Sequence, residues 1–384
     1  MNRMLTALLA AFIASCLSLS PALADPESRA RIEFATDAFA QTMLDERQTP
    51  GLVIGVARGG EPLVIRGYGL ANLEHGVPVS ENTVFRIGSV TKQFTAAAIL
   101  LLAEEGRLTL DDTLDAYFPD FPRASEVTIR QLLQHTSGIA NYTSREGFMA
   151  DTAPLAHDSA RMVAYMAAAP QPYDFDPGTG WSYSNSGYMF LDYIAEAAAG
   201  QPLADVLQER IFAPLGMDDT RMDSEAEIVA GRAQGYDAAP DAPSGFTNAP
   251  HLSLSVAAGA GAIRSTARDL LVWTHALLSG DVLSEESLAL MLEPARLNDG
   301  SLASSALESP PAALSGMDYG LGIMTGERHG HRFIGHGGSI PGFNASLIHY
   351  PDEDVTIVLL VNTIGPAARG APVLAASVFD ALAN

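Results

Sequence analysis

Strand-like patterns stand at both ends of this 384-residue chain, and helical patterns fill most of its middle. Near the amino end, the apolar and β-branched runs 52–57 and 63–68 lie on either side of Gly59-Gly60, which is typical of a β-hairpin. Further strands are predicted near the carboxyl end, at residues 320–325, 331–335, 345–349 and 355–361. Any fold of this chain must therefore bring its two ends together in one sheet.

Apolar residues recur at helical spacing in several other segments. The predicted helices are residues 27–48, 89–105, 128–135, 188–199, 204–212, 266–278 and 372–383. Because short loops link the late strands, we expect their sheet to be antiparallel. The predicted fold class is α/β of the α+β type, in which an antiparallel sheet built from both termini is flanked by helices and carries an inserted, mainly helical subdomain.

The predicted organisation has three parts. Residues 1–24 form a signal peptide, residues 25–115 and 290–384 together form the sheet-and-helix region of one domain, and residues 116–289 form the inserted region. No internal repeat divides the chain further.

The first residues have the features of an export signal. Arg3 precedes the apolar run 4–14, and Ala22-Leu23-Ala24 offers the small residues that a signal peptidase recognises. We expect cleavage after Ala24 and a periplasmic or secreted mature chain, in which no later apolar segment is long enough for a transmembrane anchor. The alternative is that residues 13–16 form a lipobox and that a lipidated Cys16 anchors the protein.

Charge and cysteine content exclude several classes of protein. With 45 acidic and 22 basic residues the net charge is -23, so the chain would repel a phosphate backbone and no nucleic-acid partner is expected. The single cysteine excludes a disulfide framework and a thiolate zinc site within the chain. Among the basic residues only Lys92 is a lysine, which predicts a role that arginine cannot fill.

The one lysine lies in a pattern that can activate a nucleophile. Ser89-Val90-Thr91-Lys92 places a hydroxyl and an amine three residues apart at a helix start, so both side chains emerge on one face. A serine needs a base, and a lysine can serve if burial lowers its pKa, whereas arginine cannot be deprotonated. The N–H of Ser89 at the helix start is also placed to bind a developing oxyanion.

Two further patterns carry polar groups in a loop and a strand. Tyr183-Ser184-Asn185 puts a phenol and an amide on the same side of an extended segment. His336-Gly337-Gly338 stands at a strand edge, where glycines let a substrate backbone come close. The three patterns in this order are far less expected by chance than any one of them.

Together these residues resemble the serine penicillin-recognising family, in the branch that holds class C β-lactamases, D-alanyl-D-alanine carboxypeptidases, D-aminopeptidases and related esterases. The resemblance runs from about residue 30 to the end and also includes residues 132–138, 177–179 and 261–270. It implies an exported serine hydrolase that forms a covalent acyl-enzyme with a small-molecule or short-peptide substrate. It implies no cofactor, and nothing else in the sequence requires one.

The resemblance also implies roles for single residues. Ser89 would be the nucleophile, Lys92 its partner base and Tyr183 the residue that carries protons to the leaving group. The implied substrate-binding residues are Asn185, His336, Gly337, Gly338 and Ser339. The backbone N–H groups of Ser89 and Ser339 would form the oxyanion hole.

The chain departs from the family pattern in the last strand motif. His336 stands where well-known class C β-lactamases carry lysine, and Gly337 replaces a hydroxyl residue that helps to hold a substrate carboxylate. These departures favour small esters or D-amino-acid amides and peptides as substrates. The alternative within the family is a true class C-like β-lactamase.

The remaining alternatives are functions that do not use a serine nucleophile. A non-catalytic binding protein on the same fold, or a secreted scaffold protein, would have no need of the serine-lysine pair. His329, His331 and His336 offer metal-ligand atoms, but a regular strand points His331 and His336 to opposite faces, so no metal site is predicted. His135 is interpreted as a structural hydrogen-bonding residue.

Overall fold

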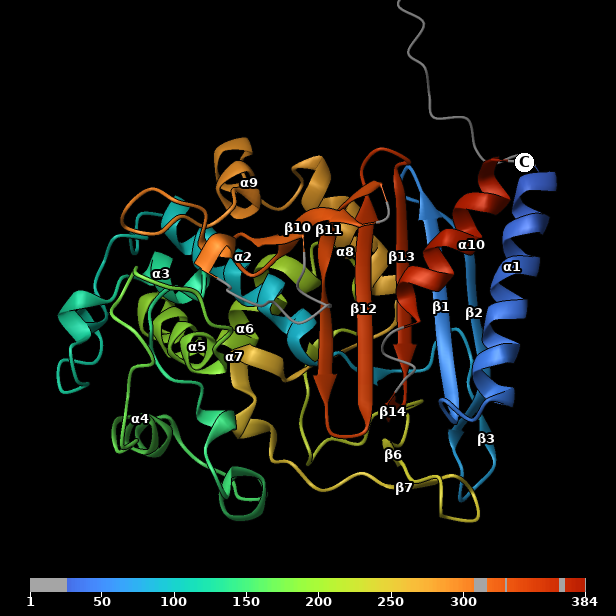
Figure 1. Cartoon of the computed structure of the whole chain (residues 1–384), viewed down its shortest axis with the longest axis horizontal. Helices are drawn as coiled ribbons and strands as arrows, with labels where there is room; N and C mark the ends of the chain where they lie inside the picture. Colours follow the sequence, from blue (N-terminus) through green and yellow to red (C-terminus); the bar gives the residue numbers. More distant parts are fainter. Residues whose placement is uncertain (1–25, 307–315, 329, 366–369, 384) are drawn as a thin grey trace, which may run out of the picture.

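Both ends of the chain meet in one eight-stranded antiparallel sheet, which confirms the predicted fold class (Figure 1). The computed structural model describes residues 26–306, 316–328, 330–365 and 370–383, so the predicted signal peptide, Cys16 and His329 lie outside the described residues. In spatial order the strands are β3 (Val77–Pro78), β2 (Glu61–Asn72), β1 (Gly51–Arg58), β13 (Val355–Val361), β12 (Phe343–Tyr350), β11 (His331–Ile340), β10 (Met324–Arg328) and β9 (Met317–Tyr319).

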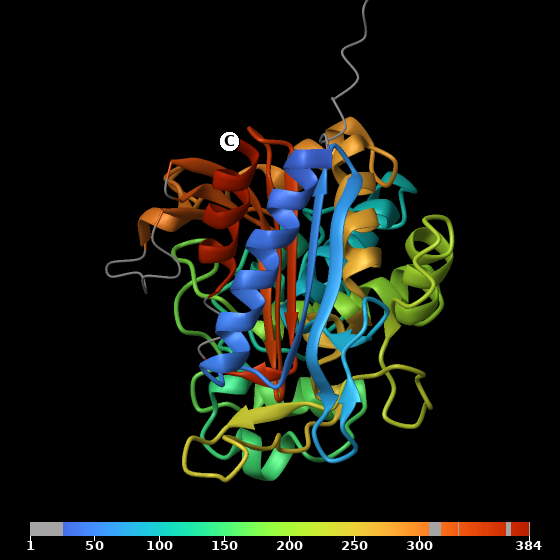
Figure 2. The ribbon, with the colours of Figure 1, turned by 90° about the vertical axis from the view of Figure 1, so that its right-hand side faces the viewer.

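Two terminal helices lie side by side on the outer face of this sheet (Figure 2). They are α1 (Pro26–Asp45) and α10 (Ala371–Ala383), and their buried side chains share a core with β1 and β13. Helix α1 ends three residues before the predicted end at Gln48. Arg47 adopts a left-handed conformation (φ 52°) and the Gln48 N–H bonds back to the Met43 carbonyl, which together close the helix.

The other face of the sheet is covered by helices from the middle of the chain (Figure 1). Helix α8 (Ala267–Ser279) contacts β1 and β13 of the sheet, although residues 116–289 were predicted to form the inserted region. The other helices are α2 (Thr91–Glu104), α3 (Ile129–Leu133), α4 (Ser159–Ala167), α5 (Asn185–Ala199), α6 (Leu203–Leu207), α7 (Ala258–Gly261) and α9 (Glu285–Leu292). None of the helices in the described ranges is long and apolar enough to cross a bilayer. The division into two regions stays a prediction.

The strand predicted over residues 320–325 is correct only at its end, where Met324 and Thr325 begin β10. Residues 320–323 form a tight turn in which the Gly320 N–H bonds to the Ile323 carbonyl, and this turn joins β9 to β10. The next strand, β11, is longer than predicted and runs through the His336 motif to Ile340. Because β10 pairs with β11 only as far as Gly335, the last residues of β11 have an open edge, and β11 contacts the 3-10 turn over residues 88–90 that precedes α2.

A small second sheet supports the segment before α2. It consists of β4 (Phe85–Arg86), β8 (Ile263–Ser265) and β5 (Arg221–Met222). Asp223, at the end of β5, has a fully buried side chain that receives hydrogen bonds from Arg86, Arg232 and Arg264. This ionic cluster joins the three strands. Arg86, at the end of β4, lies three residues before Ser89 in the chain. A third sheet contains β14 (Thr363–Ile364), β6 (Tyr236–Ala238) and β7 (Phe246–Asn248).

Removing the Asp223 carboxylate should destabilise the fold strongly, because three arginine side chains would lose their shared counter-charge. We expect Asp223→Ala to lower the free energy of unfolding by about 3 to 5 kcal/mol in urea titrations. Asp352→Ala is the matched control, since Asp352 forms an exposed pair with Arg332 and its loss should leave the free energy of unfolding nearly unchanged. Equal losses for the two variants would contradict this account of the cluster.

Candidate active site

The loop before α2 and the open edge of β11 are in direct contact. Ser89 lies in a 3-10 turn, η1 (Gly88–Val90), which leads into α2. A Cβ at Gly338 would lie 1.9 Å from the Ile87 carbonyl oxygen, and a Cβ at Gly88 would lie 2.7 Å from the Ser339 nitrogen. Only glycine allows this approach, and at Gly88 a positive φ of 51° adds a second reason. The contact brings the backbone nitrogens of residues 89 and 339 close together.

Lys92 is fully buried and contacts three polar groups of this region. Its Nζ lies 3.1 Å from Ser89 Oγ, 2.8 Å from Asn185 Oδ1 and 2.7 Å from the Ala260 carbonyl oxygen. The side chain has an exposed fraction of 0%. The serine and lysine predicted as a pair from their spacing are therefore in contact, and Asn185 joins them from α5.

The surroundings of Lys92 disfavour its charged form. Burial holds the pKa of the amine well below its usual value. Among the ion pairs of the described residues none involves Lys92, so no carboxylate opposes the shift. A neutral amine has two N–H groups and one lone pair. If the Asn185 and Ala260 oxygens accept the two N–H groups, the lone pair is left facing the Ser89 hydroxyl.

Tyr183 also lies close to Lys92, and its hydroxyl is buried. The Lys92 Nζ lies 4.8 Å from the centre of the Tyr183 ring. Desolvation raises the pKa of this phenol, and the Ser89 side chain partly offsets the rise. Tyr183 is therefore a neutral O–H donor at ordinary pH, and its hydroxyl has no other partner among the described residues.

His336 lies behind the site and not on its surface. Its exposed fraction is 2%, its Nε2 lies 3.0 Å from the Tyr319 hydroxyl, and its Nδ1 contacts the Gly337 carbonyl. Desolvation and the nearby Lys92 lower the His336 pKa to about 3, so the imidazole is neutral. The neighbouring residues Gly337 and Ser339 are exposed on the same strand.

An aromatic cluster surrounds the Lys92 and His336 side chains. It contains His135, Trp181, Tyr183, Tyr188 and Tyr319. His135 is 1% exposed, and its Nδ1 accepts a hydrogen bond from the Ser184 N–H, which holds the segment before Asn185. Burial holds the His135 pKa well below its usual value. These contacts are those of a structural residue, in keeping with its interpretation from sequence.

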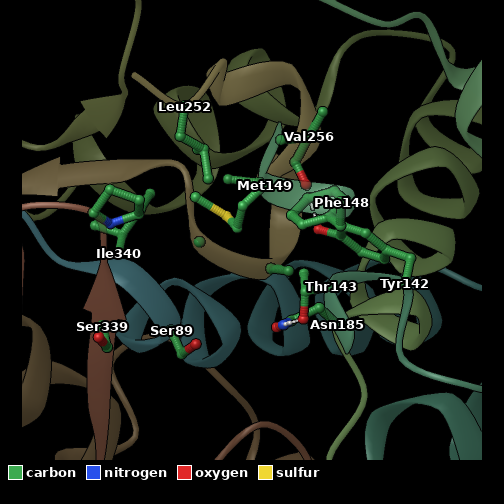
Figure 3. A pocket seen from close by; sticks show the side chains of 14 residues that line it. Ser89, Tyr142, Thr143, Phe148, Met149, Asn185, Leu252, Val256, Ser339 and Ile340 are labelled. Carbon is green, nitrogen blue, oxygen red and sulfur yellow. Dashed lines mark hydrogen bonds between the residues drawn. The ribbon is translucent and has the colours of Figure 1, made fainter. Parts of the chain in front are cut away.

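A cleft of about 200 Å³ opens above Ser89 (Figure 3). Asn185 and Thr143 lie on one side of its floor and Ser339 lies on the other. The Asn185 Nδ2 donates to Thr143 Oγ1, and its backbone N–H donates to Asn141 Oδ1. Lys92, Tyr183 and His336 are not among the described residues that line the cleft.

Two features of this site could not be predicted from the amino-acid sequence. The Ala260 carbonyl, which accepts from Lys92, lies in the short helix α7, and backbone atoms of this kind leave no mark in a side-chain pattern. Tyr319 contacts His336 from β9, seventeen positions away.

A buried carboxylate also holds α7 in place. Asp192 lies two helical turns after Asn185 on α5, and its Oδ2 accepts a hydrogen bond of 2.6 Å from the Gly259 N–H. The Gly259 carbonyl accepts from Thr95 on α2. Asp192 thus fixes the turn that carries the Ala260 carbonyl. Desolvation and, secondarily, Glu196 raise its pKa to about 7, and the Gly259 N–H opposes the rise.

The histidines near β11 do not form a cluster in the described part of the chain. His331 pairs with Glu353 at the far end of the strand from the site, and His336 bonds as described above. No group of three metal-ligating side chains is found within the described residues.

Comparisons with known proteins agree with the geometry. The family model described as Beta-lactamase matches residues 36–378. The chain is 31% identical to penicillin-binding protein 4* of Bacillus subtilis over 84% of this chain and 70% of that protein. It is 39% identical to an esterase of Burkholderia gladioli over 48% of this chain and 50% of that protein.

The fold matches a solved amidase over nearly its whole length. The D-amino acid amidase from Ochrobactrum anthropi, complexed with D-phenylalanine, superposes with a TM-score of 0.79 at 25% identity. The match covers 92% of this chain and 99% of the amidase. The two sequence relatives are longer, and the chain spans between half and about seven tenths of their length.

The raised pKa of Asp192 predicts a pH-dependent stability. Since the folded pKa of about 7 exceeds the unfolded value, ionisation costs stability, and this cost grows as pH rises from 4 to 7. Asn at this position keeps an acceptor for Gly259 but stays neutral. We expect the free energy of unfolding of wild type, relative to Asp192→Asn, to fall by about 4 kcal/mol between pH 4 and pH 8. A pH-independent difference would contradict the burial of a titrating carboxylate.

Proposed function

The chain belongs to the beta-lactamase family of serine hydrolases, and from that premise we propose that it hydrolyses small esters or D-amino-acid amides and peptides through an acyl-enzyme on Ser89. Its relatives are penicillin-binding proteins, D-aminopeptidases, amidases and esterases. The observation that carries the proposal is the 3.1 Å contact between Ser89 Oγ and the buried Lys92 amine.

In the proposed acylation step, the Ser89 hydroxyl proton moves to Lys92 Nζ as Oγ bonds to the substrate carbonyl carbon. The carbonyl oxygen becomes an oxyanion that the N–H groups of residues 89 and 339 stabilise. The bond to the leaving group then breaks, and that group leaves with a proton from the Tyr183 hydroxyl, which Lys92 restores. Water attacks the acyl-enzyme in the second half of the reaction and releases Ser89.

The groups that contact the Lys92 amine are uncharged, which favours Lys92 as the base. A lysine ammonium cannot accept the serine proton, so the amine must be uncharged before attack. Burial without a carboxylate favours the uncharged form, and the positions of Asn185 and Ala260 leave a lone pair for Ser89. The activity should consequently decline as pH falls through the lowered pKa of Lys92.

We also propose that the mature chain begins after Ala24 and acts outside the cytoplasm. The small residues before Ala24 and the apolar run 4–14 support this. The class C-like β-lactamase alternative has less support, because the buried and neutral His336 offers no cation to a substrate carboxylate.

Acylation should depend on Ser89. After treatment with an aryl fluorophosphonate, intact-mass analysis should show one adduct on wild type and none on Ser89→Ala. Ser279→Ala, which removes an exposed hydroxyl on α8, is the control and should label like wild type. An adduct that persists in Ser89→Ala would rule out this serine as the nucleophile.

Replacing the base should nearly abolish turnover. We expect Lys92→Arg to lower kcat/KM for a 4-nitrophenyl ester by at least about a hundredfold, because guanidinium cannot accept the proton. The unfolding midpoint of the variant, measured in parallel, separates this loss from misfolding. If folded Lys92→Arg retains more than about a tenth of the wild-type value, the lysine-base mechanism is wrong.

A further inference from the structure

The cleft above Ser89 has a polar floor and apolar walls (Figure 3). The floor contains the Ser89, Thr143, Asn185 and Ser339 side chains. The walls consist mainly of Tyr142, Phe148, Met149, Leu252, Val256 and Ile340. The Tyr142 hydroxyl donates to the Val256 carbonyl, so its polar atom is already satisfied within the wall.

The described lining of this cleft carries no charged side chain. The chain as a whole has a net charge of -23, so the cleft differs sharply from the rest of the protein. A carboxylate placed here would lose water without gaining a cation, and the surrounding acidic protein would add repulsion. An ammonium would find no carboxylate within the lining. Both charges are therefore costly at this position.

The volume of the cleft limits the group that it can hold. An apolar cavity of about 150 Å³ is known to hold benzene, so about 200 Å³ suits a benzyl-sized group. Figure 3 shows Met149 extending into the centre of the cleft, with Ile340 and Phe148 on opposite sides of it. Met149 lies in the π-helical turn η5 (Phe148–Thr152) and is 45% exposed, so its flexible side chain forms the outer wall.

The position of the cleft relative to the proton donor shows which half of a substrate it would hold. Tyr183, which protonates the leaving group in the proposed mechanism, does not line the cleft, whereas Asn185 and Ser339 do. The leaving group departs on the Tyr183 side. The acyl half of the substrate therefore occupies the cleft.

We infer that this cleft is an acyl subsite for uncharged, apolar groups of about benzyl size, and that it selects against acyl groups that bear a carboxylate or an ammonium. The inference rests on the proposed function and narrows it, because peptides with a free terminal carboxylate and D-amino-acid amides with a free amine are then poor substrates. Neutral esters and N-acylated amides are the preferred class.

Three aryl esters that differ in one substituent test this directly. The 4-nitrophenyl esters of 4-methyl-, 4-carboxy- and 4-(trimethylammonio)phenylacetic acid share one rigid acyl frame and one leaving group. We expect kcat/KM for the ester with the 4-methyl substituent, called the neutral ester below, to exceed that for each charged ester by at least about tenfold. An equal kcat/KM for the neutral ester and for either charged ester would overturn the inference.

Charge variants of Met149 provide a second test within the same assay. Met149→Arg should raise kcat/KM for the 4-carboxy ester relative to the neutral ester by about fivefold or more. Met149→Glu should raise kcat/KM for the 4-(trimethylammonio) ester relative to the neutral ester by about fivefold or more. Leu155→Arg and Leu155→Glu are the matched controls, since Leu155 is 57% exposed nearby but does not line the cleft. If the Leu155 variants change the ratios as much as the Met149 variants, long-range charge and not the cleft sets selectivity.

Failure of the inference can be distinguished from failure of the proposed function. If wild type and Ser89→Ala hydrolyse the neutral ester with equal kcat/KM, the proposed acyl-enzyme on Ser89 is wrong. Calorimetry on Ser89→Ala with two ketones that cannot be hydrolysed, 4-methylphenylacetone and 4-carboxyphenylacetone, then still reports on the cleft. Tighter binding of the neutral compound supports the subsite, and equal or tighter binding of the carboxylate refutes it.

Discussion

The buried amine of Lys92 contacts two carbonyl oxygens and one hydroxyl, and the other parts of the site are arranged around these contacts. Each acceptor comes from a different element: Asn185 begins α5 and Ala260 belongs to α7. Asp192 on α5 and Thr95 on α2 hold α7 in turn through the backbone of Gly259. A lysine ammonium would be poorly stabilised in this position, so the packing of three helices favours the uncharged base.

A second constraint is the contact between η1 and β11. Strand β10 stops pairing at Gly335, and the free edge of β11 continues alongside the Ser89 turn. Gly88 and Gly338 make that approach possible, and the buried Asp223 cluster supports the neighbouring strands. Because η1 lies in the first third of the chain and β11 lies near its carboxyl end, the two sides of the site are far apart in sequence and meet only through this packing.

Much of this architecture could be predicted from sequence because it depends on local patterns. Apolar alternation and helical periodicity located the terminal strands and α8, and the spacing of Ser89 and Lys92 indicated a contact pair. The turn at Gly320–Ile323 was missed, since apolar residues on both sides of it mimic one continuous strand. The burial of His336, the support from Asp192 and the uncharged walls of the cleft depend on packing between distant segments, which no local pattern encodes.

The ionisation state of Lys92 tests the central claim most directly. Since Lys92 is the only lysine, protein grown with ¹³C,¹⁵N-lysine gives a single side-chain resonance whose ¹³Cε shift can be followed against pH. We expect a midpoint well below the usual lysine value of about 10.4, so that the amine is neutral at pH values where a free lysine is still ammonium. A midpoint at or above that value in folded protein would contradict Lys92 as the base that activates Ser89.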